Sequence, residues 1–207
     1  MKIVVHKTSG KATTKKVDLN NNVFGFTPND HAIYLDVKQY LAAQRTGTHK
    51  AKERSDVKGS RRKLRKQKGS GAARVGDIKN PLFRGGGRVF GPRPRKYDLK
   101  VNKKVKRIAR KSALSYKAKN KNIIVLEDFN IDTPKTKQYL DILTNFGLQN
   151  NKTLLVLSQA NKNILLSSRN LKKARVVLAS ELNTYDVMNT NKLMLLESSI
   201  KEIEKNF

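Results

Sequence analysis

Short apolar runs alternate with stretches of helical periodicity through most of the chain. Continuous apolar runs of strand length are typical of parallel strands buried on both faces. The predicted strands are residues 2–5, 123–126, 154–157, 176–178 and 193–196. The predicted helices are residues 30–44, 102–119, 134–146, 163–168, 184–189 and 198–206. This alternation predicts an α/β fold with a Rossmann-like, mostly parallel sheet covered by helices.

Capping residues mark two of these helices. Asn29 or Asp30 is placed to cap the helix over residues 30–44. Thr133 is placed to cap, and Pro134 to start, a helix that Gly147 ends. The apolar faces expected to be buried are Ile33, Val37, Tyr40 and Leu41 in helix 30–44, Val101, Val105, Ile108, Ala109 and Ser112 in helix 102–119, and Tyr139, Ile142, Leu143 and Phe146 in helix 134–146.

Residues 45–96 show neither the helical nor the strand periodicity of apolar residues. They hold 9 of the 12 glycines and carry few apolar side chains, so they cannot bury enough surface to offset chain entropy. We therefore predict a globular α/β domain formed by residues 1–44 and 97–207, with residues 45–96 as a long inserted basic loop that orders on a partner. Because the chain must go out and return, with about 26 residues in each arm, such a loop reaches at most ~85 Å from the domain.

The charge of the chain indicates the class of partner. Lys and Arg total 45 against 16 Asp and Glu, a formal net charge of +29. Residues 45–100 contribute +15 and residues 101–125 contribute +9. So large an excess opposes compaction unless a polyanion neutralises it, which favours nucleic acid over an anionic membrane or a small-molecule substrate.

Other function classes find little support. The chain has no cysteine, which excludes disulfide scaffolds, thiol nucleophiles and cysteine-ligated metals. Its longest aliphatic runs are four residues, too short for a signal peptide or a membrane span, so a soluble intracellular protein is expected. Gly85-Gly86-Gly87 neither follows a predicted strand nor precedes Lys-Ser/Thr, as a phosphate-binding loop would require.

The titratable residues include one candidate metal site and no catalytic constellation. Glu127 and Asp128 end a predicted strand and, with Asp132, form a candidate magnesium site, although carboxylates that simply close a strand are commoner. His6, His31 and His49 share no ligand or general-base spacing; His6 fits strand packing and His31 a first helical turn. We predict no catalytic residue, no metal and no cofactor.

The basic runs carry the chemistry. Arg61, Arg62, Lys63, Arg65, Lys66 and Lys68 lie within eight residues, and Arg84, Arg88, Arg93, Arg95 and Lys96 form a second group. Arginine forks match phosphate oxygens and stack on bases, while glycine lets the backbone approach RNA closely. Phe83 and Phe90 either stack on bases or anchor the loop. The exposed faces of helix 102–119 add Lys103, Lys104, Lys106, Arg107, Arg110 and Lys111.

These motifs closely resemble the universal family of the fourth protein of the large ribosomal subunit. The matching residues are Gln67-Lys68-Gly69-Ser70-Gly71, Ala73-Arg74, Pro81 to Gly87 with Phe90, Lys103-Lys104-Val105, Ser168-Arg169-Asn170, Leu182-Asn183 and Tyr185-Asp186-Val187. The sequence departs from the bacterial pattern at Leu64-Arg65-Lys66, at Ala72 and at Phe83.

The resemblance implies a bacterial, cytoplasmic protein of the large subunit that binds 23S rRNA early in assembly and contacts neighbouring ribosomal proteins. The globular domain would lie on the outer surface, and the loop would line the peptide exit tunnel and touch the nascent peptide. No membrane and no homo-oligomer is implied. Gln67, Lys68, Gly69, Ser70 and Gly71 would form the tip. The expected rRNA-binding residues are Arg45, His49, Lys50, Arg54, Arg61, Arg62, Lys63, Arg65, Lys66, Lys68, Arg74, Arg84, Arg88, Arg93, Arg95, Lys96, Lys103, Lys104, Arg107, Arg110, Lys111, Arg169 and Asn170.

Two other classes remain open from the residues alone. One is a non-ribosomal architectural protein that binds RNA or DNA, and the other is an α/β enzyme acting on RNA. Presence in salt-washed large subunits distinguishes the first from a ribosomal protein, and turnover lost on changing Glu127 or Asp128 would favour the second.

Overall fold

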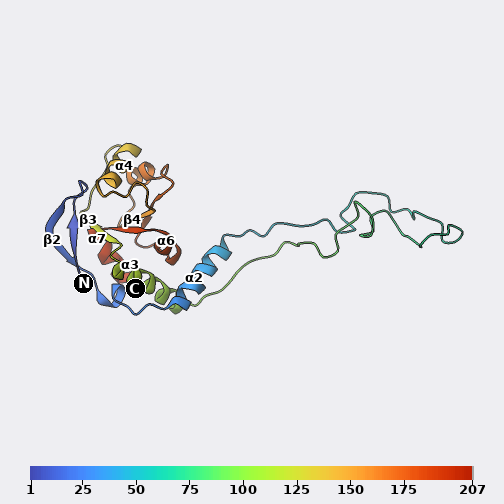
Figure 1. Ribbon diagram of the computed structural model, residues 1–207, viewed down its shortest axis with the longest axis horizontal. Coiled ribbons are helices and arrows are strands. Elements are labelled where there is room, and N and C mark those ends of the chain that lie inside the picture. The colour runs from blue at the N-terminus through green and yellow to red at the C-terminus, as the bar shows by residue number, and fades with distance from the viewer. Residues whose placement is uncertain (207) are drawn as a thin grey trace. The chain divides into compact units, whose positions relative to one another are not determined.

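The computed structural model describes residues 1–206 and contains a six-stranded sheet in the order β2-β1-β3-β6-β4-β5 (Figure 1). The strands are β1 Lys2–His6, β2 Ala12–Asp18, β3 Ile123–Leu126, β4 Thr153–Leu157, β5 Ala174–Leu178 and β6 Lys192–Leu196. Only the hairpin of β1 and β2 is antiparallel; the other neighbours pair in parallel. The predicted mostly parallel α/β sheet is confirmed.

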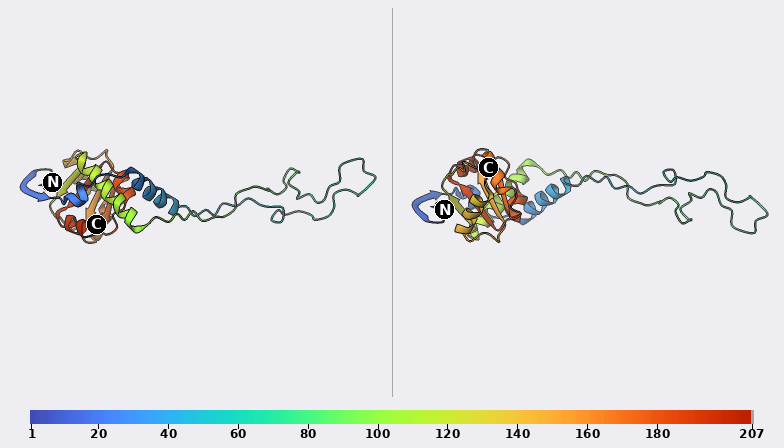
Figure 2. Two further views of the ribbon diagram at one scale, coloured as in Figure 1. Left: turned by 90° about the horizontal axis from the view of Figure 1, so that it is seen from below. Right: turned by 90° about the horizontal axis from the view of Figure 1, so that it is seen from above.

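Helices cover both faces of this sheet (Figure 2). They are α1 Asn21–Phe24, α2 Asp30–Ala43, α3 Lys103–Lys119, α4 Thr136–Asn145, α5 Lys162–Ser168, α6 Thr184–Asn189 and α7 Glu197–Asn206. One core cluster joins α1, α3, α6 and α7 to the sheet, and the other joins α4 and α5 to the opposite face. No helix among residues 1–206 combines the length and apolarity needed to cross a membrane.

Alternation along the central strands supplies the two cores. In β6, Leu193 and Leu195 belong to the first cluster, whereas Met194 and Leu196 belong to the second. β4, flanked by β6 and β5, is buried throughout. Because both faces of these strands are covered, they read as continuous apolar runs.

The structure corrects several expectations. β2 and α1 were not predicted, because β2 is polar and mostly exposed and α1 is only four residues long. Helix α4 begins at Thr136 rather than Pro134, and Lys135, not Thr133, is its N-cap residue. Leu41 and Ile108 are 43% and 36% exposed instead of buried, since each lies at the margin of its helix's packed face.

The chain divides into two units, which are described separately. The α/β unit comprises Met1–Leu41 with Lys100–Phe207, and the loop unit comprises Ala42–Leu99. Residues 45–102 contain turns and bends but no helix or strand. The loop unit is therefore held by isolated contacts rather than by regular secondary structure.

Candidate nucleic-acid interface

Single backbone hydrogen bonds join the two arms of the loop unit at intervals. They run from the amides of Ala51, Leu64, Arg88 and Arg95 to the carbonyls of Pro92, Gly76, Lys52 and Gly47, with lengths of 2.9 to 3.2 Å. Residues 45–102 form no helix or strand, so the other backbone groups of the arms are not paired in a continuous ladder. This arrangement gives the loop a fixed pairing of its arms while leaving its surface open.

Two residues of the triple glycine, Gly86 and Gly87, lie so close to other backbone atoms that a side chain would not fit. A Cβ atom on Gly87 would lie 2.4 Å from the amide nitrogen of Arg54, and one on Gly86 would lie 2.0 Å from the carbonyl oxygen of Asn80. Both positions are closed to any side chain. Gly87 therefore allows the two arms to pack closely, and Gly86 allows the tight turn that begins at Asn80.

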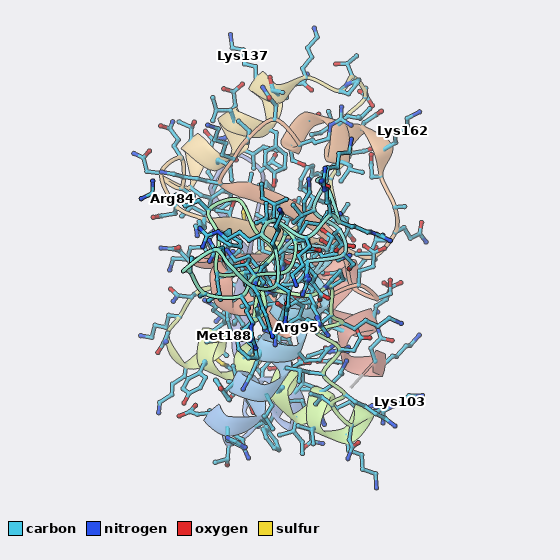
Figure 3. All side chains as sticks on the ribbon, turned by 90° about the vertical axis from the view of Figure 1, so that its right-hand side faces the viewer. Arg84, Arg95, Lys103, Lys137, Lys162 and Met188 are labelled. Atoms are coloured by element: carbon cyan, nitrogen blue, oxygen red, sulfur yellow. The ribbon has the colours of Figure 1, made fainter. Side chains whose placement is uncertain are left out.

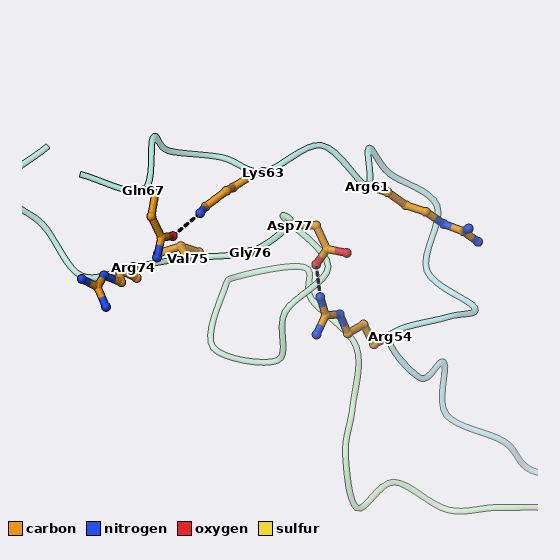
Figure 4. Close-up of a pocket in the computed structure, with 8 residues that line it drawn as sticks. All are labelled: Arg54, Arg61, Lys63, Gln67, Arg74, Val75, Gly76 and Asp77. Atoms are coloured by element: carbon orange, nitrogen blue, oxygen red, sulfur yellow. Dashed lines mark hydrogen bonds and ion pairs between the residues drawn. The ribbon is translucent and has the colours of Figure 1, made fainter. Parts of the chain in front are cut away.

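Three acidic residues of the loop unit pair with its own cations. Lys50 contacts Asp56 at 2.9 Å, and this hydrogen bond lowers the pKa of the Asp56 carboxyl. Arg54 lies 3.0 Å from Asp77 (Figure 4), and Arg93 Nε lies 2.7 Å from Glu53. The cations of these pairs are exposed, so the pairs contribute little stability and their cations can still reach an anion.

An aromatic residue that sequence reasoning missed organises the end of the loop unit. The ring of Tyr97 lies 3.8 Å from the guanidinium of Arg45 and 4.6 Å from that of Arg95. The hydrogen bond from Arg95, together with the charge of Arg45, lowers the pKa of Tyr97. Gly47 approaches the same ring with φ of +60°. The signal that could have found the site is a tyrosine directly after an arginine-rich run.

The other predicted residues of the loop are exposed, whereas Lys79, which was not among them, is buried. Figure 3 labels two exposed arginines of the loop unit, Arg84 and Arg95. The exposed set is His49, Arg61, Arg62, Lys63, Arg65, Lys66, Lys68, Arg74, Arg84, Arg88 and Lys96. Phe83 is half-buried and Phe90 is fully exposed, which leaves Phe90 available for stacking.

The predicted tip is also exposed throughout. Gly69 and Gly71 have φ angles of +82° and +60° and would have no atom within 4 Å of an added Cβ, so they are required by conformation, not by packing. Lys63 donates a hydrogen bond to the side chain of Gln67 across this bend (Figure 4). Beside it lies an open pocket of about 500 Å³, whose cationic lining consists of Arg54, Arg61, Lys63 and Arg74.

In the α/β unit, α3 presents the other predicted cations. Lys103, Lys104 and Arg107 are exposed at the start of the helix, and Arg110 and Lys111 are half-buried. Lys106 turns to donate a 3.0 Å hydrogen bond to Gln39 of α2. The exposed cations that were predicted on this helix thus lie in its first two turns.

Two further predicted residues lie apart from α3. Arg169 and Asn170 are exposed at the end of α5, which packs on the sheet face opposite α3. The α/β unit therefore offers at least two separate basic surfaces.

One of the candidate magnesium residues, Asp128, has a structural role. Asp128 accepts hydrogen bonds from the hydroxyl and amide of Ser198, at 2.7 and 3.3 Å, and so caps the first turn of α7. Residues 1–206 contain no group of three His, Asp or Glu side chains placed to hold a metal. His6 packs edge-on against Phe146 and His31 stacks on Tyr34, as predicted for structural histidines.

Comparison with known proteins identifies the family. The family model described as "Ribosomal protein L4/L1 family" matches residues 17–206. This chain belongs to the ribosomal protein L4/L1 family. It is 60% identical to large ribosomal subunit protein uL4 of Flavobacterium johnsoniae, covering 100% of this chain and 99% of the relative. Proteins of the same name from Christiangramia forsetii and Parabacteroides distasonis are 57% and 58% identical, again over at least 98% of each chain.

The relatives are bacterial, as the resemblance implied. Ribosomal proteins of this family are structural and not enzymatic. An α/β enzyme acting on RNA is accordingly set aside.

Proposed function

We propose that this chain is a structural constituent of the large ribosomal subunit, placed in the cytoplasm within the ribosome. Its partners are 23S rRNA and neighbouring large-subunit proteins. The observation that carries the proposal is the loop unit, which exposes all sixteen of its predicted cationic or histidine side chains on a backbone that forms no helix or strand over residues 45–102. Family membership gives this surface its biological setting.

The loop suits RNA that is folded and crowded. Exposed arginines supply planar forks for phosphate oxygens, and backbone groups left outside a ladder can meet the 2′-hydroxyls of RNA. The backbone hydrogen bonds between the arms reduce the conformational entropy lost on binding RNA, because the arms are already paired in the free protein. In the α/β unit, the start of α3 and Arg169 with Asn170 provide further contacts.

The finer part of the proposal concerns the tip, Gln67–Gly71, which lines the exit tunnel and touches the nascent peptide. Small and polar side chains at this bend leave room in a lumen, and Lys68 supplies a single charge to its wall. The open surroundings of Gly69 and Gly71 fit a segment that faces a channel.

The long irregular loop also favours binding to rRNA early in assembly. A loop of this length, without secondary structure of its own, must be placed before rRNA closes around it. We therefore expect this protein to join among the first during assembly of the large subunit.

The decisive experiment replaces the chromosomal uL4 gene of Flavobacterium johnsoniae with a tagged copy of this chain. Large subunits are washed in high salt and their proteins quantified by mass spectrometry. One copy per subunit is expected for the intact chain, because loop contacts surrounded by RNA resist salt, and sub-stoichiometric recovery is expected after deletion of residues 55–90. Loss of the intact chain at the wash would instead favour a non-ribosomal architectural protein.

A further inference from the structure

A second group of lysines lies on the α/β unit, at the edge of the sheet where the parallel strands begin. Lys121 lies two residues before β3, Lys152 and Lys173 directly precede β4 and β5, and Lys192 begins β6. Lys117, in the last turn of α3, donates a hydrogen bond to the carbonyl of Thr190, two residues before Lys192. We call Lys117, Lys121, Lys152, Lys173 and Lys192 the lysine edge.

The strand order makes this group a row. The four strands are adjacent in the order β3-β6-β4-β5, at a spacing of about 4.8 Å. Contacts confirm the sequence of neighbours: Lys192 Nζ donates to the carbonyl of Lys121 at 3.1 Å, and the Lys192 amide donates to the carbonyl of Lys152 at 3.2 Å. The Thr153 amide donates to the carbonyl of Lys173 at 2.8 Å.

The ammonium groups of the row meet only neutral acceptors in the hydrogen bonds seen. Lys152 donates to the side chain of Asn189 at 3.1 Å, Lys173 to the carbonyl of Asn150 at 3.0 Å, and Lys192 to the side chain of Asn122 at 2.8 Å. None of the salt bridges among residues 1–206 involves the lysine edge.

The ends of the helices explain why lysines lie at this edge, but they do not explain why so many positive charges gather without acidic partners. Helices of an α/β fold end at this edge, and lysine near such an end complements the exposed carbonyls. The row nevertheless gathers like charges: burial lowers the pKa of Lys117, and the charge of Lys192 lowers it further. An anion from outside would relieve this repulsion.

We infer that the lysine edge is a second RNA-binding surface, independent of the loop unit and of the start of α3, and that it takes the sugar-phosphate backbone of a single RNA segment. This inference rests on the proposed rRNA-binding function. Lysine and asparagine are side chains that contact phosphate and sugar without reading sequence. The ammonium groups of the edge contact asparagine side chains and backbone carbonyls and not aromatic or apolar anchors of the kind that dominate protein interfaces, which favours RNA over an acidic protein.

Lysine acetylation with and without RNA tests this in the intact chain. The probe is deproteinised 23S rRNA of Flavobacterium johnsoniae, and labelling at each lysine is read by mass spectrometry. Lys152 and Lys173, both exposed, should be protected several-fold. Lys137 and Lys162, equally exposed at the starts of α4 and α5 (Figure 3), should label as in the free protein.

A matched pair of variants measures the energetic share. Lys152→Gln with Lys173→Gln should lower the slope of log K against log salt by about 1–2, since each phosphate neutralised contributes about 0.7–0.9. Lys137→Gln with Lys162→Gln removes the same charge and should leave the slope unchanged. Thermal melts of both variants confirm that they are folded, and the acetylation result on the unmodified chain decides the question if either is not.

The outcomes separate this inference from the proposed function. Protection of loop lysines without protection of Lys152 and Lys173 overturns the lysine edge and leaves the loop intact as an RNA-binding element. Protection of neither overturns both. Protection of the edge by purified large-subunit proteins but not by RNA would also overturn the inference, and would make this surface a protein-docking site.

Discussion

At the scale of single residues, a buried carboxylate fastens α2 to α6. Asp36 and Thr184 are 8% and 1% exposed, and the Thr184 hydroxyl donates a hydrogen bond to Asp36. Neither residue drew attention in the sequence, because a lone aspartate in a helix usually faces solvent. Burial makes this contact specific, since an unpaired polar group in the core costs free energy.

Asp36→Ala should lower the free energy of unfolding by about 1–3 kcal/mol, because Thr184 keeps a buried hydroxyl without its acceptor. Urea denaturation followed by circular dichroism measures the change. Asp18→Ala is the control: Asp18 is exposed and lies 3.9 Å from Lys2, so its loss should change stability little. Equal effects of the two substitutions would show that Asp36 is not structurally special.

A glycine pair in the loop unit tests whether its arms are held as described. Gly87→Ala would place Cβ 2.4 Å from the Arg54 amide nitrogen, whereas at Gly76 the nearest atom lies 3.6 Å away. Overpacking costs about 1–3 kcal/mol, so Gly87→Ala should weaken rRNA binding by about tenfold and Gly76→Ala hardly at all. Filter binding at fixed salt gives both constants. Identical affinities would mean that the arms separate on binding RNA.

At the scale of elements, the buried strands could be predicted from the sequence and the exposed ones could not. The central strands were found because they are covered on both faces and read as apolar runs, as Leu193–Leu196 shows. β2 was missed because its exposed side chains follow no apolar pattern. The start of α4 was misplaced because Thr133 and Pro134 satisfy the capping rules locally, yet the helix begins two residues later. Tertiary packing, absent from local rules, decides such boundaries.

The loop as an element should dominate the electrostatic part of rRNA affinity. Deleting residues 55–90 removes eleven Lys and Arg, and the hydrogen bond of Ala51 to Pro92 keeps the cut ends close. The slope of log K against log salt should fall by several, because each lost phosphate contact removes about 0.7–0.9. The α/β unit should retain its circular dichroism. An unchanged slope would assign the affinity to α3 and the other surfaces of the α/β unit.

At the scale of the whole molecule, the predicted site is a distribution of charge more than a constellation of side chains. Composition was sufficient to find the basic loop, because excess charge and glycine content are visible without any contact. The pairs that Arg54 forms with Asp77 and Arg93 with Glu53, and the stacking of Arg45 on Tyr97, are not predicted by the sequence because they join residues far apart along the arms. Sequence therefore predicts which part of the chain meets RNA, and structure adds how that part is ordered.

The proposed division of labour within the ribosome can be tested at the tip. Lys68 is one of 45 basic residues, so Lys68→Glu should leave the yield of large subunits nearly unchanged and alter the response to stalling peptides and tunnel-binding drugs. Arg84 and Arg88 flank the triple glycine, and the Arg88 amide also joins the arms through Lys52. Changing both arginines to Gln should reduce the subunit yield, because two phosphate contacts are lost where the backbone is most closely packed.

Each variant is expressed as the only copy, and sucrose gradients are compared with stalling and drug assays. A Lys68→Glu strain that makes few large subunits, with normal tunnel behaviour in those it makes, would place Lys68 in assembly instead of at the lumen. The matched substitution Lys66→Glu, two residues before Lys68 in the same exposed run, controls for charge reversal alone. A tunnel phenotype confined to Lys68→Glu is the expected result, since a lumen senses the charge on its wall and not the net charge of the loop.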